Sequence, residues 1–374
     1  MSANTANATL NNSNNCALKI NGQKYEGWKD VHIERGIEQM TGIFRLEVSE
    51  RWPAQVTPRP IMASDACVLS IDDEPVITGW VDETSPGFNE SGTSFDVTGR
   101  DKSGDLCDCS AIFKTGQWKK TTLKQIATDL LAPYAIPLTI TASATKAAMA
   151  TIASFNIEDG ETVLACLDRA CKIKALMIWA DGAGGLVLGL PGLERATTAL
   201  EQGVNIISCK LTYKTNDRHS EYIVKGQARG KGGHNIKDSV KDPAVTRHRP
   251  LIIINEEQGE GHTPKERANF ELATRQSRGN RATVRVQSWR QDGDKGALWA
   301  PGLLVSFASD YVRFHGYLLI VKVAYIKNER DGTVCDLELA DPHALDRLSE
   351  DKNKPKAHKA TRKGKASHKD MSTL

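Results

Sequence analysis

The stretch VLSIDDEPVITGW, residues 68–80, returns in altered form as VSFASDYVRFHGY, residues 305–317. Each stretch begins with a valine, carries an aspartate five positions later (Asp73 and Asp310) and ends on a glycine followed by an aromatic residue. The distance from the valine to the glycine is the same in both. Apolar residues that alternate with polar ones around a polar centre indicate two half-buried strands joined by a turn. The chain is therefore predicted to contain two related strand–turn–strand units.

The similarity continues beyond these stretches. Residues 92–97, GTSFDV, and residues 332–337, GTVCDL, follow them at comparable distances, and each segment leads to a further aspartate, Asp101 or Asp341. A repeated sequence pattern indicates a repeated structural unit, because each copy is expected to adopt the same fold. We therefore predict an α+β protein, mainly β, with two similar antiparallel β-barrel-like domains and an α/β domain between them.

Residues 17–99 are predicted to form the first β-barrel domain. Apolar side chains alternate with polar ones in this part of the chain, as at Phe44, Leu46 and Val48, which is typical of strands with one buried face. Asn21 and Gly22 suit a tight hairpin turn, and the Ser-Pro-Gly cluster at residues 85–87 suits a looser loop.

Residues 100–190 are predicted to form a small α/β domain. Leu123, Ile126, Ala127, Leu130 and Leu131 recur at helical spacing and predict an amphipathic helix that ends before Pro133. A second helix is expected from about Glu161 to Cys171, with Asp159 as its N-cap.

Residues 191–347 are predicted to form the second β-barrel domain with one surface helix. Its expected strands cover residues 206–213, 222–226, 251–254, 283–289, 303–307, 318–326 and 334–339. The helix is opened by Thr263, Pro264 and Glu266, which form a capping box with proline at the first helical position. Its many arginines predict that it lies on the surface or against another subunit.

The two ends of the chain differ from the rest. Residues 1–16 are Asn-rich and are expected to form a disordered arm without the features of a secretory signal. Residues 348–374 are expected to form a basic disordered tail, since residues 352–369 carry eight lysines or arginines and no acid. This tail either contacts phosphate or an acidic partner or only keeps the protein soluble. No apolar run approaches the length of a membrane span.

Catalytic signatures are absent from the sequence. It contains no HExxH, no G-x-S-x-G and no Walker-type phosphate loop. Arg229 and Lys231, among the glycines of residues 227–234, could cradle a phosphate, but a mobile hairpin loop fits this segment better. The acidic pairs at residues 72–73 and 256–257 could supply glycosidase carboxylates, yet adjacent acids in turns are usually just solvated.

Eight cysteines are scattered along the chain. Cys107 and Cys109 form a C-x-C, and Cys166 and Cys171 lie five positions apart, but no further pair or histidine cluster completes a zinc set. His219, His234, His248 and His262 are interpreted as surface residues. We therefore predict no catalytic, no cofactor-binding and no metal-binding residue, and a protein that is not an enzyme.

Three segments resemble the baseplate hub proteins of Mu-like contractile-tailed phages and prophages. Residues 18–53, with Gly27, Trp28 and the sequence ERGIE, resemble the first domain of that family. Residues 97–111, which contain VTGRD and DLCDCSA, resemble its crossing into the second domain. Residues 282–301, with Trp289, are similar to its last domain before the closing strands. The resemblance covers residues 17–347.

This resemblance implies a homotrimer in which two similar barrels per chain make a ring of six. Such a ring would join a six-fold tail tube to a three-fold central spike, with tube or tape-measure proteins, the spike and baseplate wedge proteins as partners and no cofactor. The location implied is the virion tail baseplate, assembled in the host bacterial cytoplasm. Basic side chains of the second barrel or of the tail are expected to line or plug the central channel.

Two other classes remain possible from the sequence alone. A tail-associated cell-wall hydrolase would need a carboxylate pair in a cleft. A nucleic-acid-binding protein would use the basic tail at residues 348–374, and its binding would weaken steeply with salt. The rest of the chain carries a net negative charge, which argues against a broad DNA-binding surface.

Overall fold

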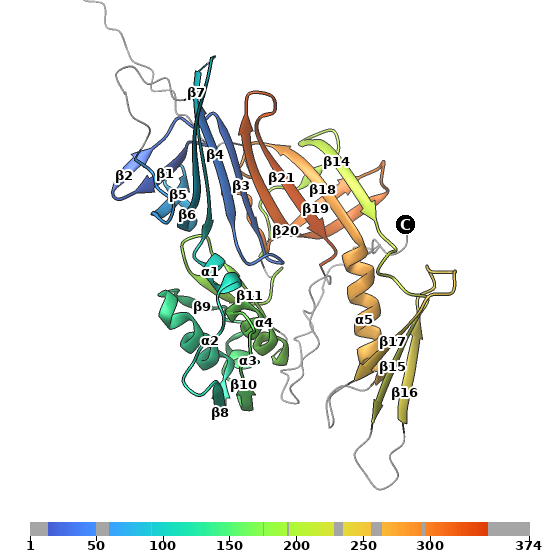
Figure 1. Cartoon of the computed structure of the whole chain (residues 1–374). Helices are drawn as coiled ribbons and strands as arrows, with labels where there is room; N and C mark the ends of the chain where they lie inside the picture. Colours follow the sequence, from blue (N-terminus) through green and yellow to red (C-terminus); the bar gives the residue numbers. More distant parts are fainter. Residues whose placement is uncertain are drawn as a thin grey trace, which may run out of the picture.

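The computed structural model describes residues 14–49, 60–90, 92–174, 176–192, 194–227, 235–255, 264–293 and 296–342. Strands dominate these residues, and most of them belong to a single sheet of 13 strands. A small α/β unit lies against one half of this sheet, and a unit made of one helix and three strands lies beyond the other half (Figure 1). The predicted mainly β fold is confirmed.

The first half of the sheet is built from the first seven strands. They are β1 (Cys16–Ile20), β2 (Gln23–Tyr25), β3 (Asp30–Gly36), β4 (Ile43–Ser49), β5 (Ala66–Ile71), β6 (Glu74–Asn89) and β7 (Gly92–Asp101). Their spatial order is β3-β4-β7-β6-β5-β1-β2. Asn21 and Gly22 form the turn between β1 and β2, both with positive φ, as the Asn-Gly pair predicts.

The second half repeats this arrangement. Its strands are β13 (Leu200–Glu201), β14 (Ile206–Tyr213), β18 (Asn280–Gln287), β19 (Leu304–Ser309), β20 (Phe314–Asn328) and β21 (Gly332–Ala340). Their order, β14-β18-β21-β20-β19-β13, matches β3-β4-β7-β6-β5-β1 strand for strand. The outermost pair differs, because β13 is parallel to β19 whereas β1 is antiparallel to β5. The predicted similarity of the two β domains is confirmed.

A β-bulge in the long strand of each half shows which residues of the two halves are structurally equivalent. The long strand β6 shifts register against β7 between Val81 and Glu83, and β20 shifts register against β21 between Ile320 and Lys322. Gly79 lies two residues before the first bulge and Gly316 lies four residues before the second, so the repeat alignment from sequence is wrong by two residues here. The hairpin turns explain the shift, since residues 72–73 connect β5 to β6 and residues 310–313 connect β19 to β20.

Proline and glycine at residues 85–87 do not break the chain into a loop. The structure places them inside β6, paired with residues 94–96 of β7. This part of the sequence prediction is wrong. Proline is compatible with a strand at the edge of a sheet, where its missing N–H leaves no neighbour without a hydrogen bond.

The two halves are joined into one sheet by β3 and β20. These strands pair antiparallel over residues 31–36 and 322–327. The apolar faces of both halves form a single buried cluster that includes Val31, Ile33, Trp289 and Tyr325. The halves therefore form one continuous body.

The α/β unit follows β7. Its elements are α1 (Ser103–Asp108), β8 (Gln117–Thr122), α2 (Leu123–Leu131), η1 (Ala132–Tyr134), β9 (Leu138–Ile140), α3 (Thr145–Ala148), β10 (Thr151–Asn156), α4 (Val163–Ile173), β11 (Met177–Ala180) and β12 (Leu186–Gly189). Helix α2 covers the predicted residues. Helix α4 begins later than predicted, because Thr162, and not Asp159, accepts a hydrogen bond from the first turn.

A separate unit is inserted between β14 and β18. It consists of β15 (Glu221–Gln227), β16 (Asn235–Lys241), β17 (Pro250–Asn255) and α5 (Pro264–Gly279), and its strands form their own sheet in the order β16-β15-β17. The strands expected at residues 222–226 and 251–254 are therefore not part of the second barrel, and this part of the sequence prediction is wrong. They form a separate sheet because Tyr222 and Val224 pack against Ala268 of α5 in a small core of their own. Helix α5 thus covers this sheet, a contact that the sequence analysis did not predict.

The first described residues pack against the sheet. Asn14 and Cys16 were expected in a disordered arm, but Asn14 is buried and Cys16 opens β1. The backbone N–H groups of Asn14 and Asn15 donate to the Asp72 carboxylate at 2.9 and 2.8 Å, which holds this segment against the β5–β6 turn. The basic tail, Thr263 and residues 228–234 lie outside the described residues. The expected domain boundaries at residues 99, 190 and 347 stay predictions.

Candidate assembly surfaces

The joint between β3 and β20 shows how one half of the sheet attaches to the other. Lys322 Nζ lies 2.5 Å from Glu34 Oε2, and His32 Nε2 lies 2.9 Å from Glu34 Oε1. Burial alone would raise the pKa of the Glu34 carboxyl, but the hydrogen bonds from Lys322 and His32 outweigh it and lower the pKa below its usual value. The joint thus combines a strand ladder with a charged cluster.

Three arginines of the second half reinforce the body. Arg290 Nη2 lies 3.1 Å from Asp72 Oδ2 in the β5–β6 turn of the first half. Arg281 Nη2 lies 2.6 Å from Glu38 Oε1, just after β3. Arg285 forms two hydrogen bonds with the Asp336 carboxylate at 2.7 and 2.8 Å, across β18 and β21. The pairs made by Arg290 and Arg281 therefore join the two halves in addition to the ladder, whereas the Arg285 pair lies within the second half.

The α/β unit is attached below the first half. Arg35 Nη2 donates to the Asp181 carbonyl at 2.6 Å. Asp101 accepts from the backbone N–H of Gly42 at 2.5 Å and of Ser103 at 2.9 Å. Burial raises the pKa of the Asp101 carboxyl, although these hydrogen bonds and the Arg35 charge act in the opposite direction. This aspartate fixes the crossing from β7 into the α/β unit.

Strand β14 ends the sheet with an open edge. Among the described residues it pairs only with β18. Ile207, Tyr213 and the nearby Val204 expose large apolar side chains, and Cys209 is exposed as well. Open apolar edges are templates for pairing with another strand, which natural proteins usually cover or protect.

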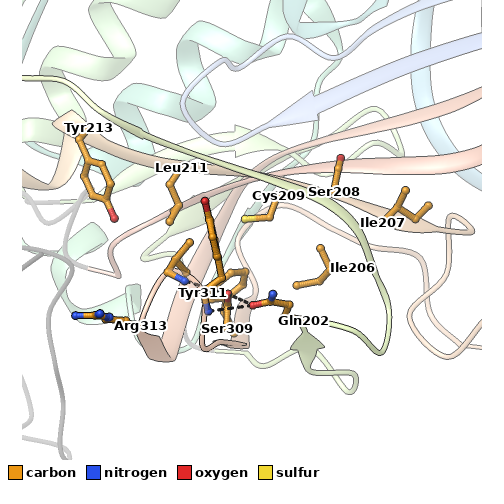
Figure 2. Close-up of a pocket in the computed structure, with 12 residues that line it drawn as sticks. Gln202, Ile206, Ile207, Ser208, Cys209, Leu211, Tyr213, Ser309, Tyr311 and Arg313 are labelled. Carbon is orange, nitrogen blue, oxygen red and sulfur yellow. Dashed lines mark hydrogen bonds between the residues drawn. The ribbon is translucent and has the colours of Figure 1, made fainter.

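A groove of about 520 Å³ runs beside this edge. Figure 2 shows Tyr213, Leu211 and Cys209 of β14 on the side that faces Gln202, Ser309 and Tyr311, whereas Ser208 points the other way. Gln202 Oε1 accepts hydrogen bonds from Ser309 Oγ at 2.5 Å and from the Tyr311 N–H at 3.2 Å, so the far wall of the groove is ordered. The groove is mainly apolar along β14, and its opposite wall mixes polar side chains with Phe307 and Val312.

A second open edge lies on the outer half of β6. Residues 83–89 pair with β7 on one side, and no described strand pairs with them on the other. Phe88 in this segment is 90% exposed, which is unusual for an aromatic residue in a strand. The Ser-Pro-Gly composition of residues 85–87 predicts a loop, so the sequence gives no indication of this surface.

The residues weighed as candidate sites have structural surroundings. Asp72 binds the N-terminal segment and Arg290, and Asp73 lies beside Lys24, so this acidic pair does not line a cleft. His219 packs edge-on against Tyr222. Glu256, Glu257, Arg229, Lys231, His234 and His262 lie outside the described residues.

The cysteines show no metal site in the described part of the chain. All eight are free thiols, and no described group of three His, Cys, Asp or Glu residues is placed to hold a metal ion. Cys107 lies 3.0 Å from Thr41 Oγ1, and Cys166 and Cys171 are buried in the core of the α/β unit. The prediction that no residue binds a metal or a cofactor or acts in catalysis stays a prediction.

Two solved tail proteins have the same fold as this chain. A 43 kDa tail protein of prophage MuSo2 from Shewanella oneidensis is 30% identical, with a TM-score of 0.79 over 89% of this chain and 99% of that one. A tail protein from Neisseria meningitidis has a TM-score of 0.76 over 90% of this chain and 99% of that one, at 23% identity. The fold therefore defines the class of phage-tail structural proteins.

Sequence comparison gives the family. The baseplate hub protein gp44 of Escherichia phage Mu is 34% identical over 340 residues, which are 88% of each chain. Three family models match in order: the GpP-like N-terminal domain of Mu phage baseplate assembly proteins at residues 15–101, the second domain of gp44-like baseplate hub proteins at 103–190, and the GpP fourth domain at 261–348. The chain belongs to the Mu phage baseplate hub protein family. No helix among the described residues is long and apolar enough to span a membrane.

Proposed function

We propose that this protein is a structural, non-enzymatic subunit of a contractile-tail baseplate, in which three copies form a ring with quasi-six-fold symmetry. The observation that carries the proposal is the duplication: β3-β4-β7-β6-β5-β1 and β14-β18-β21-β20-β19-β13 have the same order. A chain with two equivalent units supplies six equivalent positions from three copies. Such a ring can match a six-fold tube on one side and a three-fold spike on the other.

The proposed partners follow from this geometry. Tail tube or tape-measure proteins would contact one face of the ring, and the central spike would contact the other. The α/β unit and the unit of α5 with β15–β17 lie outside the duplicated sheet, so both are free to contact the spike or wedge proteins (Figure 1). The location proposed is the virion tail baseplate, after assembly in the bacterial cytoplasm.

Electron microscopy of the purified chain tests this proposal. Class averages are expected to show a ring with six similar lobes around a channel and, outside it, two additional densities from each of the three chains. Rings of a different order, or isolated single chains at every concentration, would contradict it. Tail particles labelled on this chain should carry the label only at the baseplate end.

A further inference from the structure

We propose that the uncovered face of the sheet β16-β15-β17 is a docking surface for an acidic segment of another baseplate protein. We call this surface the lysine face, and it consists of Ile223, Lys225, Lys237, Lys241 and Ile252. The inference rests on the proposed function, since it identifies which part of a peripheral unit recognises a partner and by what chemistry. The surface lies outside the duplicated sheet.

Helix α5 covers only one face of this small sheet. Tyr222 and Val224 of β15 pack with Ala268 of the helix in a core of their own. Alternate residues of a strand point to opposite faces, so Ile223 and Lys225 are on the other face. Figure 1 shows α5 along one side of β15–β17 and no described element beside the far face. The far face is therefore open to a partner.

The register places two isoleucines next to each other on the open face. Ile223 of β15 is paired with Ile252 of β17. Ile252 is 54% exposed, and Ile223 is half-buried. A sheet with one solvated face normally directs its apolar residues inward and its polar residues outward. An isoleucine pair on the outward face departs from this alternation and provides an apolar anchor for a partner.

Lysines lie beside this apolar pair. Lys225 of β15 is paired with Lys237 of β16, and both are exposed. Lys241 is on the same face, four residues along β16, and is exposed as well. Like charges that lie directly opposite each other destabilise a strand pair. An anionic partner would remove this repulsion.

The acids of this unit do not neutralise the three lysines. Glu221 is opposite Lys241, but its Oε1 atom accepts a hydrogen bond from Ser239 Oγ at 2.8 Å. Asp238 is one position from Lys237 and is therefore on the face that α5 covers. Among the residues that the structure describes, the ion pairs of this unit involve arginines and not these lysines. The lysine face thus keeps a net positive charge.

An acidic protein segment with some apolar residues matches this surface best. Its carboxylates would neutralise the opposed lysines, and its apolar side chains would cover the isoleucine pair. Nucleic acid matches less well, because base stacking needs aromatic side chains and the described residues of this face include none. A membrane surface also matches less well, since faces that enter a bilayer present tryptophan, phenylalanine or leucine.

Thiol reactivity in purified tails tests the docking. Ile252→Cys places a thiol within the lysine face, and Ala273→Cys at an exposed position of α5 is the matched control. In the isolated trimer both thiols should react with a maleimide at similar rates. In tail particles free of DNA and lipid, Ile252→Cys is expected to react at least tenfold more slowly, while Ala273→Cys should keep its rate. Mass spectrometry of labelled peptides separates the new thiols from the native ones.

Two double variants test the chemistry of the partner. Lys225→Glu with Lys237→Glu reverses both charges of the opposed pair, whereas Lys225→Arg with Lys237→Arg keeps them. In the Ile252→Cys background, the glutamate pair should restore the fast reaction in tails or exclude the chain from them. The arginine pair should leave the protection intact. Both double variants should form the same trimer in isolation, because the substituted side chains are exposed.

The inference fails, and the proposed function stands, if Ile252→Cys reacts as fast in tails as in the isolated trimer. Protection that is already present in the isolated trimer, or that requires added DNA or anionic vesicles, would also overturn it. A second copy, nucleic acid or a membrane would then be the occupant. Equal protection with the glutamate and arginine pairs would exclude an acidic partner. Absence of the chain from purified tails would refute the proposed function together with this surface.

Discussion

Replacing Arg218 with methionine is expected to open the unit of α5 and β15–β17 while the large sheet stays folded. Arg218 donates from Nε and Nη2 to the two oxygens of Asp242, both at 3.0 Å. The Asp242 side chain is completely buried and that of Arg218 is 8% exposed. The Asp242 Oδ1 atom also accepts from Gln276 of α5 at 3.1 Å, so this carboxylate ties the strands to the helix.

The size of the effect follows from burial. Arg218→Met keeps an apolar stem of similar length and leaves a buried carboxylate with only neutral donors. Breaking a buried ion pair by removing one partner costs about 3–5 kcal/mol. The small core of this unit, around Tyr222, Val224 and Ala268, is not expected to absorb that cost. Asp242→Asn in the same background should recover most of the loss, because it removes the uncompensated charge.

Hydrogen exchange measured by mass spectrometry is the appropriate assay, because it reports opening segment by segment. The free energy of opening for peptides from β15–β17 should fall by about 3–5 kcal/mol, whereas peptides from β18 and β21 should change little. Arg278→Met replaces an exposed arginine of α5 and is the control. Its free energy of opening for β15–β17 should stay within about 0.5 kcal/mol of the unmodified protein. Equal destabilisation of the large sheet, or no change in β15–β17, would refute the reasoning.

Three further predictions concern the joint, the core and the buried cysteines. Glu34 has a pKa below its ordinary value, so its contribution to stability is present above about pH 4.5 and is lost as the pH falls through the folded-state pKa. Glu34→Gln should therefore reduce the loss of stability at acidic pH, measured as the denaturation midpoint against pH, and an unchanged pH dependence would contradict this. Trp289 is fully buried and donates to the carbonyls of Ile326 and Val334, so Trp289→Phe should cost about 2–4 kcal/mol in chemical denaturation, while Trp80→Phe at a partly exposed site should cost under about 1 kcal/mol. A thiol reagent at pH 8 should modify the exposed Cys109 faster than Cys16 or Cys67, because burial raises the pKa of both of these thiols to about 12. Equal rates for the three cysteines, followed by mass spectrometry of labelled peptides, would contradict this.

The sequence predicted the duplication because turn residues and strand periodicity recur in both copies. It misplaced part of the alignment, since the turn after β5 spans residues 72–73 whereas that after β19 spans residues 310–313. Local patterns record which residues alternate, but they do not record the register in which two distant strands pair. The bulges near Val81 and Ile320 became visible only in the paired structure.

The separate unit of β15–β17 shows another limit of sequence analysis. Tyr222 and Val224 alternate with polar residues just as the strands of the large sheet do, so their pattern predicted a strand without indicating which sheet it joins. Which sheet a strand joins is decided by long-range contacts, and here these are the contacts with α5. The prediction of a loop at residues 85–87 was wrong for a related reason. The Ser-Pro-Gly composition favours a loop, but the position of these residues at a sheet edge permits a strand.

The open edges were not predictable from the sequence at all. Nothing in the residues near Cys209 or Phe88 indicates that their strands lack a partner, since this depends on the complete strand order. The duplication therefore carries both the fold prediction and the assembly proposal.

The most direct test of the account is the mass of the purified protein in solution, measured by light scattering coupled to size exclusion over a range of concentrations. The account predicts a discrete species of three times the 40.9 kDa chain mass. A species that remains a single chain at every concentration, or a stable dimer, would contradict the proposed ring.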